Sequence, residues 1–298
     1  MNLFDSKSIS GDSTFNRLRD NPELDRQRSF INQLFEQFDE YSDNNFVSEF
    51  PHHCISRFWE MYLGCALLNS GFKLVPRSIL KEGGPDICIK QKDSYVWIEA
   101  VAPNNGTDPD LVSFMNRLNT KVATQVPEEQ IVLRFCSAIK DKHCQHLQHI
   151  RDGLVSPNEP FIIAVNGAGV SHSNTQPGDI PYPIQAVFPS GNYTIVFDPK
   201  TRQKLDEGFI YRPKLVKQKG SDVSTDIFRN CNYAFISALL FSNIHPFNCK
   251  EINFADFSLL HHHSPLNQLA KGWLHSGWEW WIEEEPNLRL CRINVATS

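Results

Sequence analysis

Three acidic residues stand inside otherwise apolar segments between residues 58 and 102, and this placement constrains the fold more than any other feature. Glu60 lies in a run of aromatic and aliphatic residues, Asp86 starts one alternating run, and Glu99 stands in a second. A carboxylate in a buried element is costly unless it is paired or binds a cation. Hard divalent cations prefer oxygen ligands. We therefore expect Glu60, Asp86 and Glu99 to converge on a site for Mg²⁺ or Mn²⁺.

The local sequence around these acids indicates a helix followed by a hairpin. Residues 56–70 have the composition of a buried helix, whereas residues 86–91 and 95–101 alternate with the period of strands. The polar residues between the two alternating runs are typical of a turn, so the two runs read as an antiparallel pair. In such a pair Asp86, at the start of one strand, lies across from Glu99, near the end of the next.

This order resembles the PD-(D/E)XK nuclease superfamily, which has the restriction-endonuclease-like fold. The superfamily pattern is a helix with Glu, then Pro-Asp at a strand, then Glu-x-Lys on the next strand. Here Glu60, Pro85-Asp86 and Glu99-Ala100-Val101 occupy these positions. The resemblance implies a metal-dependent endonuclease that hydrolyses phosphodiester bonds in DNA, in restriction, defence or DNA processing. Asp86 and Glu99 would hold Mg²⁺ (or Mn²⁺), and Glu60 would assist directly or through water.

The chain departs from this pattern at Val101, where the superfamily has its catalytic lysine. Members of the superfamily supply that amine from other elements, and two lysines are candidates here. Lys142 is favoured, because a helix starting near residue 138 would project its first turns toward the carboxylates. Lys121, in a helix-like run over 110–125, is the alternative. The missing lysine also leaves open a nuclease-fold module that binds nucleic acid with little or no catalytic activity.

Composition and charge narrow the classes of protein to which this chain can belong. Hydrophobic residues make up 41% of the 298 residues, enough for a sizeable core, and the net charge of −5 disfavours a protein that coats nucleic acid. We expect no membrane span, and eight scattered cysteines without a Cys-x-x-Cys pair indicate a reducing, cytoplasmic setting. Double-strand cleavage is compatible with a homodimer. The densest basic cluster is expected to contact the nucleic acid and comprises Arg212, Lys214, Lys217 and Lys219.

The order of predicted elements indicates a mixed α/β fold with helices on a central sheet. We divide the chain into an N-terminal helical segment (1–50), a restriction-endonuclease-like core (51–170) and a C-terminal β-rich extension (171–298), which can pack on the core. After the hairpin the core is expected to contain a helix, a strand, a helix and a strand, at 110–125, 130–135, 138–152 and 160–166. The extension is expected to contain strands at 186–188, 193–197 and 236–241.

Three histidines, His143, His146 and His149, follow one another at intervals of one helical turn. Imidazoles at this spacing can bind zinc, but a structural zinc site normally has four ligands and no Cys-x-x-Cys partner lies nearby. The spacing therefore favours an ordinary polar helix surface. The tryptophans near the C-terminus could stack on bases, although packing in the core or at an interface is the more common use of such side chains.

Overall fold

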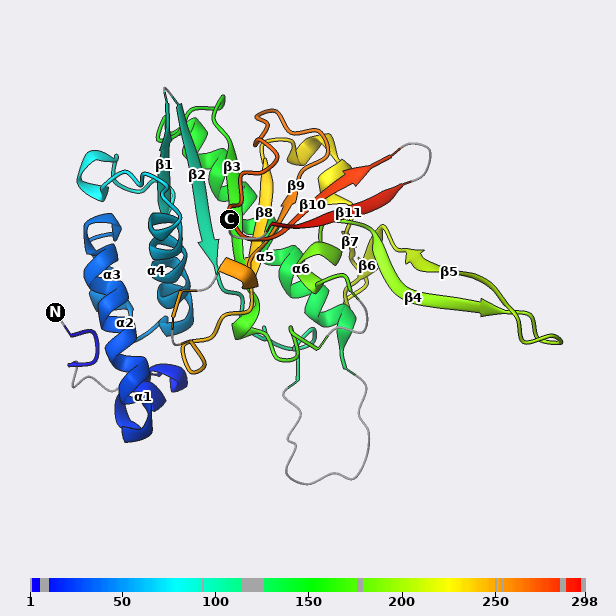
Figure 1. Ribbon diagram of the computed structural model, residues 1–298, viewed down its shortest axis with the longest axis horizontal. Helices are drawn as coiled ribbons and strands as arrows, with labels where there is room; N and C mark the ends of the chain where they lie inside the picture. Colours follow the sequence, from blue (N-terminus) through cyan, green and yellow to red (C-terminus); the bar gives the residue numbers. More distant parts are fainter. Residues whose placement is uncertain are drawn as a thin grey trace.

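A mixed sheet of seven strands forms the centre of the protein, in the order β1-β2-β3-β8-β9-β10-β11 (Figure 1). The mixed α/β class expected from the sequence is therefore confirmed. The computed structural model describes residues 2–5, 11–92, 94–113, 126–175, 179–249, 251–252, 254–284 and 288–295. The strands of the sheet are β1 (Ile87–Gln91), β2 (Ser94–Val101), β3 (Phe161–Asn166), β8 (Ala238–Ser242), β9 (Ser258–His261), β10 (Gly277–Glu283) and β11 (Arg289–Val295).

Helices cover both faces of the sheet, and the alternation of side chains along β2 shows which helix covers which face. Val96 and Ile98 share a core with the N-terminal helices, whereas Trp97 packs in a second core with the longest helix. Side chains two apart on a strand share a face, so Glu99 points toward the second core. The helices are α1 (Ser13–Asp20), α2 (Asp25–Phe38), α3 (Phe46–Glu49), α4 (Cys54–Asn69), α5 (Glu128–Arg151) and α6 (Tyr182–Gln185).

Helix α4 is the buried helix predicted at 56–70, and it is apolar on almost every side. Its Trp59 indole Nε1 donates a hydrogen bond of 3.0 Å to the carbonyl of Ala164 on β3. On the opposite side α4 packs against α2 at Gly64, where a Cβ atom would lie 2.2 Å from the ring of Phe38. This close contact needs a glycine, and it fixes the position of Glu60 one turn earlier.

Strands β1 and β2 form the predicted antiparallel hairpin, with Ile87 opposite Ile98. The turn starts at Lys92, whose φ of 48° lies in the left-handed region. Trp97, on the face of β2 that packs in the second core, donates a hydrogen bond of 2.6 Å from its indole Nε1 to Glu159. The hairpin therefore carries Glu99 on β2 and places Asp86 immediately before β1, one residue outside the strand predicted at 86–91.

The predicted strand at 130–135 is wrong, because these residues belong to α5. The apolar run begins with Ile131 and Val132, which favour strands, and a short apolar run does not distinguish a strand from a buried helix segment. The run continues at Phe135 and Ile139, four residues apart, and all of these side chains are buried. The predicted helix at 138–152 is the second half of α5. Parallel neighbours β2 and β3 need such a crossover helix.

The C-terminal strands continue the sheet formed by the N-terminal ones. Strand β3 pairs in parallel with β8, which places Ile163 beside Leu239. The strand predicted at 193–197 lies within β4 (Ser190–Phe197), and the one predicted at 236–241 overlaps β8, which starts two residues later. The strand predicted at 186–188 is wrong: these residues form a turn after α6, in which the amide of Val187 donates to the carbonyl of Ile184. The boundary expected near residue 170 therefore lies between two hydrogen-bonded strands of one sheet.

Two hairpins stand apart from the sheet. Strand β4 pairs with β5 (Lys204–Tyr211), and this ribbon projects away from the body of the molecule (Figure 1). Strand β6 (Lys214–Val216) pairs with β7 (Asp222–Ser224). The predicted helix at 110–125 lies largely outside the described residues. Within the described part of the chain, no helix has both the length and the apolar composition needed to cross a membrane.

Candidate active site

Glu99 is the centre of the candidate site, and it is a buried carboxyl group with one hydrogen-bonded oxygen and one that has no hydrogen-bond partner among the described residues. Its side chain is 1% exposed, on the β2 face that packs against α5. Oε2 accepts a hydrogen bond, but Oε1 has no hydrogen-bond partner among the described residues. A buried carboxylate oxygen without a donor costs free energy, so this atom is placed to bind a ligand that the protein itself does not supply.

Lys142 brings an amine to the two carboxylates of the hairpin. Its Nζ donates a hydrogen bond of 2.7 Å to Glu99 Oε2 and lies 4.0 Å from Asp86 Oδ2. The lysine comes from the middle of α5, on the side of the sheet that Glu99 faces. One ammonium therefore contacts both carboxylates of the hairpin, and the prediction that Lys142 lies within reach of Glu99 is confirmed.

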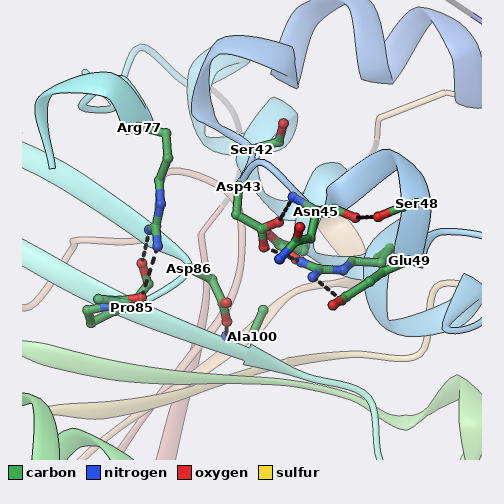
Figure 2. Close-up of polar contacts among 12 residues, drawn as sticks. Ser42, Asp43, Asn45, Ser48, Glu49, Arg77, Pro85, Asp86 and Ala100 are labelled. Atoms are coloured by element: carbon green, nitrogen blue, oxygen red, sulfur yellow. Dashed lines mark hydrogen bonds and ion pairs between the residues drawn. The ribbon is translucent and has the colours of Figure 1, made fainter. Parts of the chain in front are cut away.

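The backbone around Asp86 is held on both sides (Figure 2). Asp86 points toward β2, where its Oδ2 accepts a hydrogen bond of 2.7 Å from the amide of Ala100. Arg77 donates to the carbonyls of Pro85 at 2.7 Å and Gly84 at 3.3 Å, so the loop before Asp86 cannot shift freely. These contacts orient the carboxylate before any ligand binds, which reduces the reorganisation that binding needs.

Glu60 approaches the site from α4 but is bound to an arginine. Arg57, one turn earlier, donates to Glu60 Oε2 at 2.7 Å and to Asp43 Oδ2 at 2.9 Å, and it also bonds Glu49. Asp43 and Glu49 come from the segments just before α4 (Figure 2). Glu60 is therefore part of a buried ion-pair network, in which a metal would compete with the guanidinium for its oxygens.

Electrostatics show that the acids lie close enough to influence one another. Burial and then the negative charge of Asp86 raise the pKa of Glu99, and the same two causes raise the pKa of Glu60. Burial lowers the pKa of Lys142, but the carboxylates of Glu99 and Asp86 outweigh it, so the net shift is upward. Lys142 therefore keeps its positive charge, because the carboxylates of Glu99 and Asp86 both face its ammonium group. The raised pKa values of Glu60 and Glu99 mean that these two groups bind a proton more readily than an exposed glutamate does.

His149 also lies beside the site, which was not predicted from the sequence. Its Nδ1 lies 3.4 Å from Glu99 Oε1, and neither atom makes a hydrogen bond within the described part of the chain. Burial and then the ammonium of Lys142 lower the pKa of His149, so its imidazole is neutral at pH 7. The missed signal was spacing: positions 142 and 149 are seven residues apart and therefore share one helix face.

The predicted polar surface over the three histidines is wrong, because all three are buried. His146 stacks on Phe161 of β3 with 3.7 Å between ring centroids, and His143 packs against Tyr233. Nor do the described residues form a group of three or more His, Cys, Asp or Glu side chains able to hold a metal ion by themselves. Any metal at Asp86 and Glu99 must therefore complete its shell with water or substrate.

The predicted basic cluster is divided in two. Lys217 and Lys219 line a polar cavity of about 380 Å³ together with Arg134 of α5. Arg134 is eight residues before Lys142, roughly 12 Å along the helix at 1.5 Å per residue. The other two cations are used within the protein: Arg212 donates to Gln185 at 3.1 Å, and Lys214 pairs with Asp222 at 2.6 Å. Lys121 lies outside the described residues.

The structure therefore brings together Asp86, Glu99 and Lys142, places Glu60 near enough for the charge of Asp86 to raise its pKa, and keeps the basic cluster apart from them. The site combines an oriented carboxylate, a buried carboxylate with a free oxygen, and a charged amine. Such a set can bind a hard cation and an anionic oxygen at the same place. Comparison of the chain with protein-family models, with curated proteins and with solved structures finds no match.

Proposed function

We propose that this protein is a metal-dependent endonuclease that hydrolyses phosphodiester bonds in DNA, with Asp86 and Glu99 as the metal ligands and Lys142 as the amine. One observation carries the proposal: Lys142 Nζ lies 2.7 Å from Glu99 Oε2 and 4.0 Å from Asp86 Oδ2. An ammonium reaches the two acids of the hairpin from another element. The order of helix α4, hairpin and α5–β3 supports the assignment of residues 51–170 to a restriction-endonuclease-like core.

The donor set fits Mg²⁺ or Mn²⁺. Glu99 Oε1 is buried without a hydrogen-bond partner among the described residues, and Asp86 is held nearby by the amide of Ala100. Magnesium is usually bound by one or two carboxylates plus water and substrate phosphates rather than by a complete protein cage. Asp86 and Glu99 would hold such a metal and leave its other positions to water and substrate. When bound, Mg²⁺ supplies polarisation of the scissile phosphate and a lower pKa for its water.

Lys142 has two tasks in this proposal. In the free protein its ammonium offsets the charge of Glu99, which would otherwise stand unpaired in a buried position. When a phosphodiester binds, the same ammonium can donate to a phosphate oxygen as negative charge builds up there. His149 is neutral and lies beside Glu99 Oε1, so it restricts the direction from which a ligand reaches that oxygen.

A polymeric substrate agrees with the polar cavity in which Arg134, Lys217 and Lys219 outnumber two carboxylates, Asp108 and Asp110. Its Arg134 lies roughly 12 Å along α5 from Lys142, which is about three to four phosphate spacings of ~3.4 Å along one DNA strand. Lysine and arginine side chains there can contact phosphates without reading the base sequence. The chain as a whole is acidic, with a net charge of −5, so attraction of DNA depends on such a local cluster.

The test is cleavage of supercoiled plasmid and of single-stranded oligonucleotides with Mg²⁺, with Mn²⁺ and with EDTA. We expect metal-dependent cutting by the wild-type protein and none by Asp86→Asn or Glu99→Gln, with circular dichroism confirming that both variants fold. Binding is measured separately by fluorescence anisotropy in Ca²⁺. A wild-type protein that binds DNA but cuts neither substrate in either metal would favour the nuclease-fold binding module instead.

A further inference from the structure

The ribbon formed by β4 and β5 exposes large apolar side chains to an unusual degree. Each strand has eight residues, and the ribbon extends beyond the body of the molecule (Figure 1). Leu205 near the tip is 64% exposed and Phe197 is 54% exposed. An isolated two-stranded ribbon is marginally stable in water, and exposed apolar patches of this kind mark interaction surfaces.

The two faces of the ribbon differ. Tyr193 stands directly opposite Phe209, and their rings meet edge to face with 5.1 Å between centroids. Ile195 is two residues after Tyr193 and Tyr211 is two after Phe209, so all four share one side, which we call the aromatic face. The other face contains Thr194, Asp206 and Gly208 as well as Val196 and Ile210.

A groove continues the aromatic face at the base of the ribbon. It has a volume of about 580 Å³ and lies between β5 and the last strands of the sheet. Phe209 and Tyr211 form one wall, and Trp280 and Leu290 contribute to the other. The ribbon thus has apolar side chains at its tip and an apolar groove at its base.

We propose that the aromatic face packs against the aromatic face of a second copy of this chain, with the two ribbons antiparallel about a two-fold axis. In this arrangement Phe197 and Leu205 at the tip of one ribbon reach the groove at the base of the other. A two-fold interface uses the same patch on both copies, so it requires tip and base to be complementary in this way. The proposal is independent of the nuclease assignment.

The area and the charge of the ribbon fit a second copy. Six large side chains of the aromatic face and the tip would be covered: Tyr193, Ile195, Phe197, Leu205, Phe209 and Tyr211. Each is about half exposed and offers roughly 100 Å², so two copies bury roughly 1,200 Å² in total, which is the lower end of the range for stable interfaces. The one carboxylate on the aromatic face, Glu207, is already bound to Tyr193 and Lys204. That face therefore offers no unpaired cation to a phosphate backbone, which disfavours nucleic acid as its occupant.

The test compares neighbouring residues that point to opposite faces. Ile195 is 46% exposed on the aromatic face and Val196 is 49% exposed on the other. We expect the wild-type protein to sediment as a dimer at about 10 μM in analytical ultracentrifugation. Ile195→Glu should be monomeric, with its apparent mass halved, whereas the matched control Val196→Glu should remain dimeric.

A second variant controls for the possibility that Ile195→Glu is monomeric because it misfolds. Leu205→Glu changes the ribbon tip, far from the folded body, and should also give a monomer with an unchanged circular dichroism spectrum. A monomeric wild-type protein at concentrations up to about 100 μM would overturn the proposal. So would a dimer that survives both Ile195→Glu and Leu205→Glu, because its interface would then lie elsewhere.

Discussion

Replacement of Lys142 by alanine tests the candidate site most directly. The ammonium lies 2.7 Å from Glu99 Oε2 and 4.0 Å from Asp86 Oδ2, so it is placed beside any phosphate that binds there. At an effective dielectric constant of about 20, two unit charges about 4 Å apart interact by ~4 kcal/mol. Loss of one preorganised donor to a developing oxyanion costs about 10²–10³ in kcat. We therefore expect Lys142→Ala to cut about 10²–10³ times more slowly.

The assay is single-turnover cleavage at saturating Mg²⁺, with DNA affinity measured by anisotropy in Ca²⁺. An interaction made mainly in the transition state lowers the cleavage rate and leaves DNA affinity almost unchanged. Lys140→Ala is the matched control, because Lys140 is on the same helix, is exposed, and undergoes the same change of helix propensity. Both variants should keep the wild-type circular dichroism spectrum.

Two results would refute this reasoning. If Lys142→Ala cleaves at the wild-type rate, the amine takes no part in the reaction and the metal alone must activate the water. If the loss disappears at higher Mg²⁺ concentration, Lys142 acts only through Glu99: its ammonium lowers the pKa of that carboxyl group, and its removal weakens metal binding. A metal titration of each variant separates these cases.

Burial and the charge of Asp86 raise the pKa of Glu99 in the folded protein above its value in the unfolded chain. Glu99 therefore stabilises the metal-free protein at low pH, and this stabilisation is lost as the pH rises through the folded-state pKa. Melting temperatures in EDTA should therefore fall from about pH 5 to 9, and fall less for Glu99→Gln; equal slopes would contradict this. Arg57→Met leaves the buried Glu60 unpaired and should cost about 3–5 kcal/mol in urea unfolding at pH 9, whereas wild-type stability would mean that the network contributes little. Gly64→Ala should cost about 1–3 kcal/mol, because its Cβ would meet an aromatic ring of α2 at 2.2 Å, while Gly11→Ala, with nothing within 4 Å, should unfold like wild type.

The hairpin and its carboxylates could be predicted because the information is local. Asp86 and Glu99 are close in sequence, and the alternation around them fixes both the strand type and the face of each side chain. Lys142 was predicted near Glu99 from a helix expected to start near residue 138; the contact is present, but α5 starts at Glu128 and Lys142 lies in its middle rather than in its first turns. That Oε1 of Glu99 has no hydrogen-bond partner among the described residues could not be predicted, because it depends on which donors of α5 come near it.

The elements predicted from the sequence were wrong where the same residues suit more than one packing environment. The run Ile131–Phe135 suits a strand as well as a buried helix, and only the longer period through Ile139 decides between them. His146 looks polar in sequence, yet it stacks on Phe161 because that side of α5 faces the sheet. Pairing of β3 with β8 joins residues more than seventy positions apart, and no local pattern encodes such a contact.

That pairing has a consequence for the order in which the protein is made. All six residues of β3 are buried, and the strand has hydrogen-bonding partners on both edges, β2 before it and β8 after it. During synthesis the second edge stays open until the ribosome has released the chain beyond Ser242, several seconds after β3 itself emerges at about 5–20 residues per second. An apolar, unpaired edge exposed for that time is a template for wrong pairing. The nascent chain therefore depends on the late strand β8 to protect the strand beside its candidate active site.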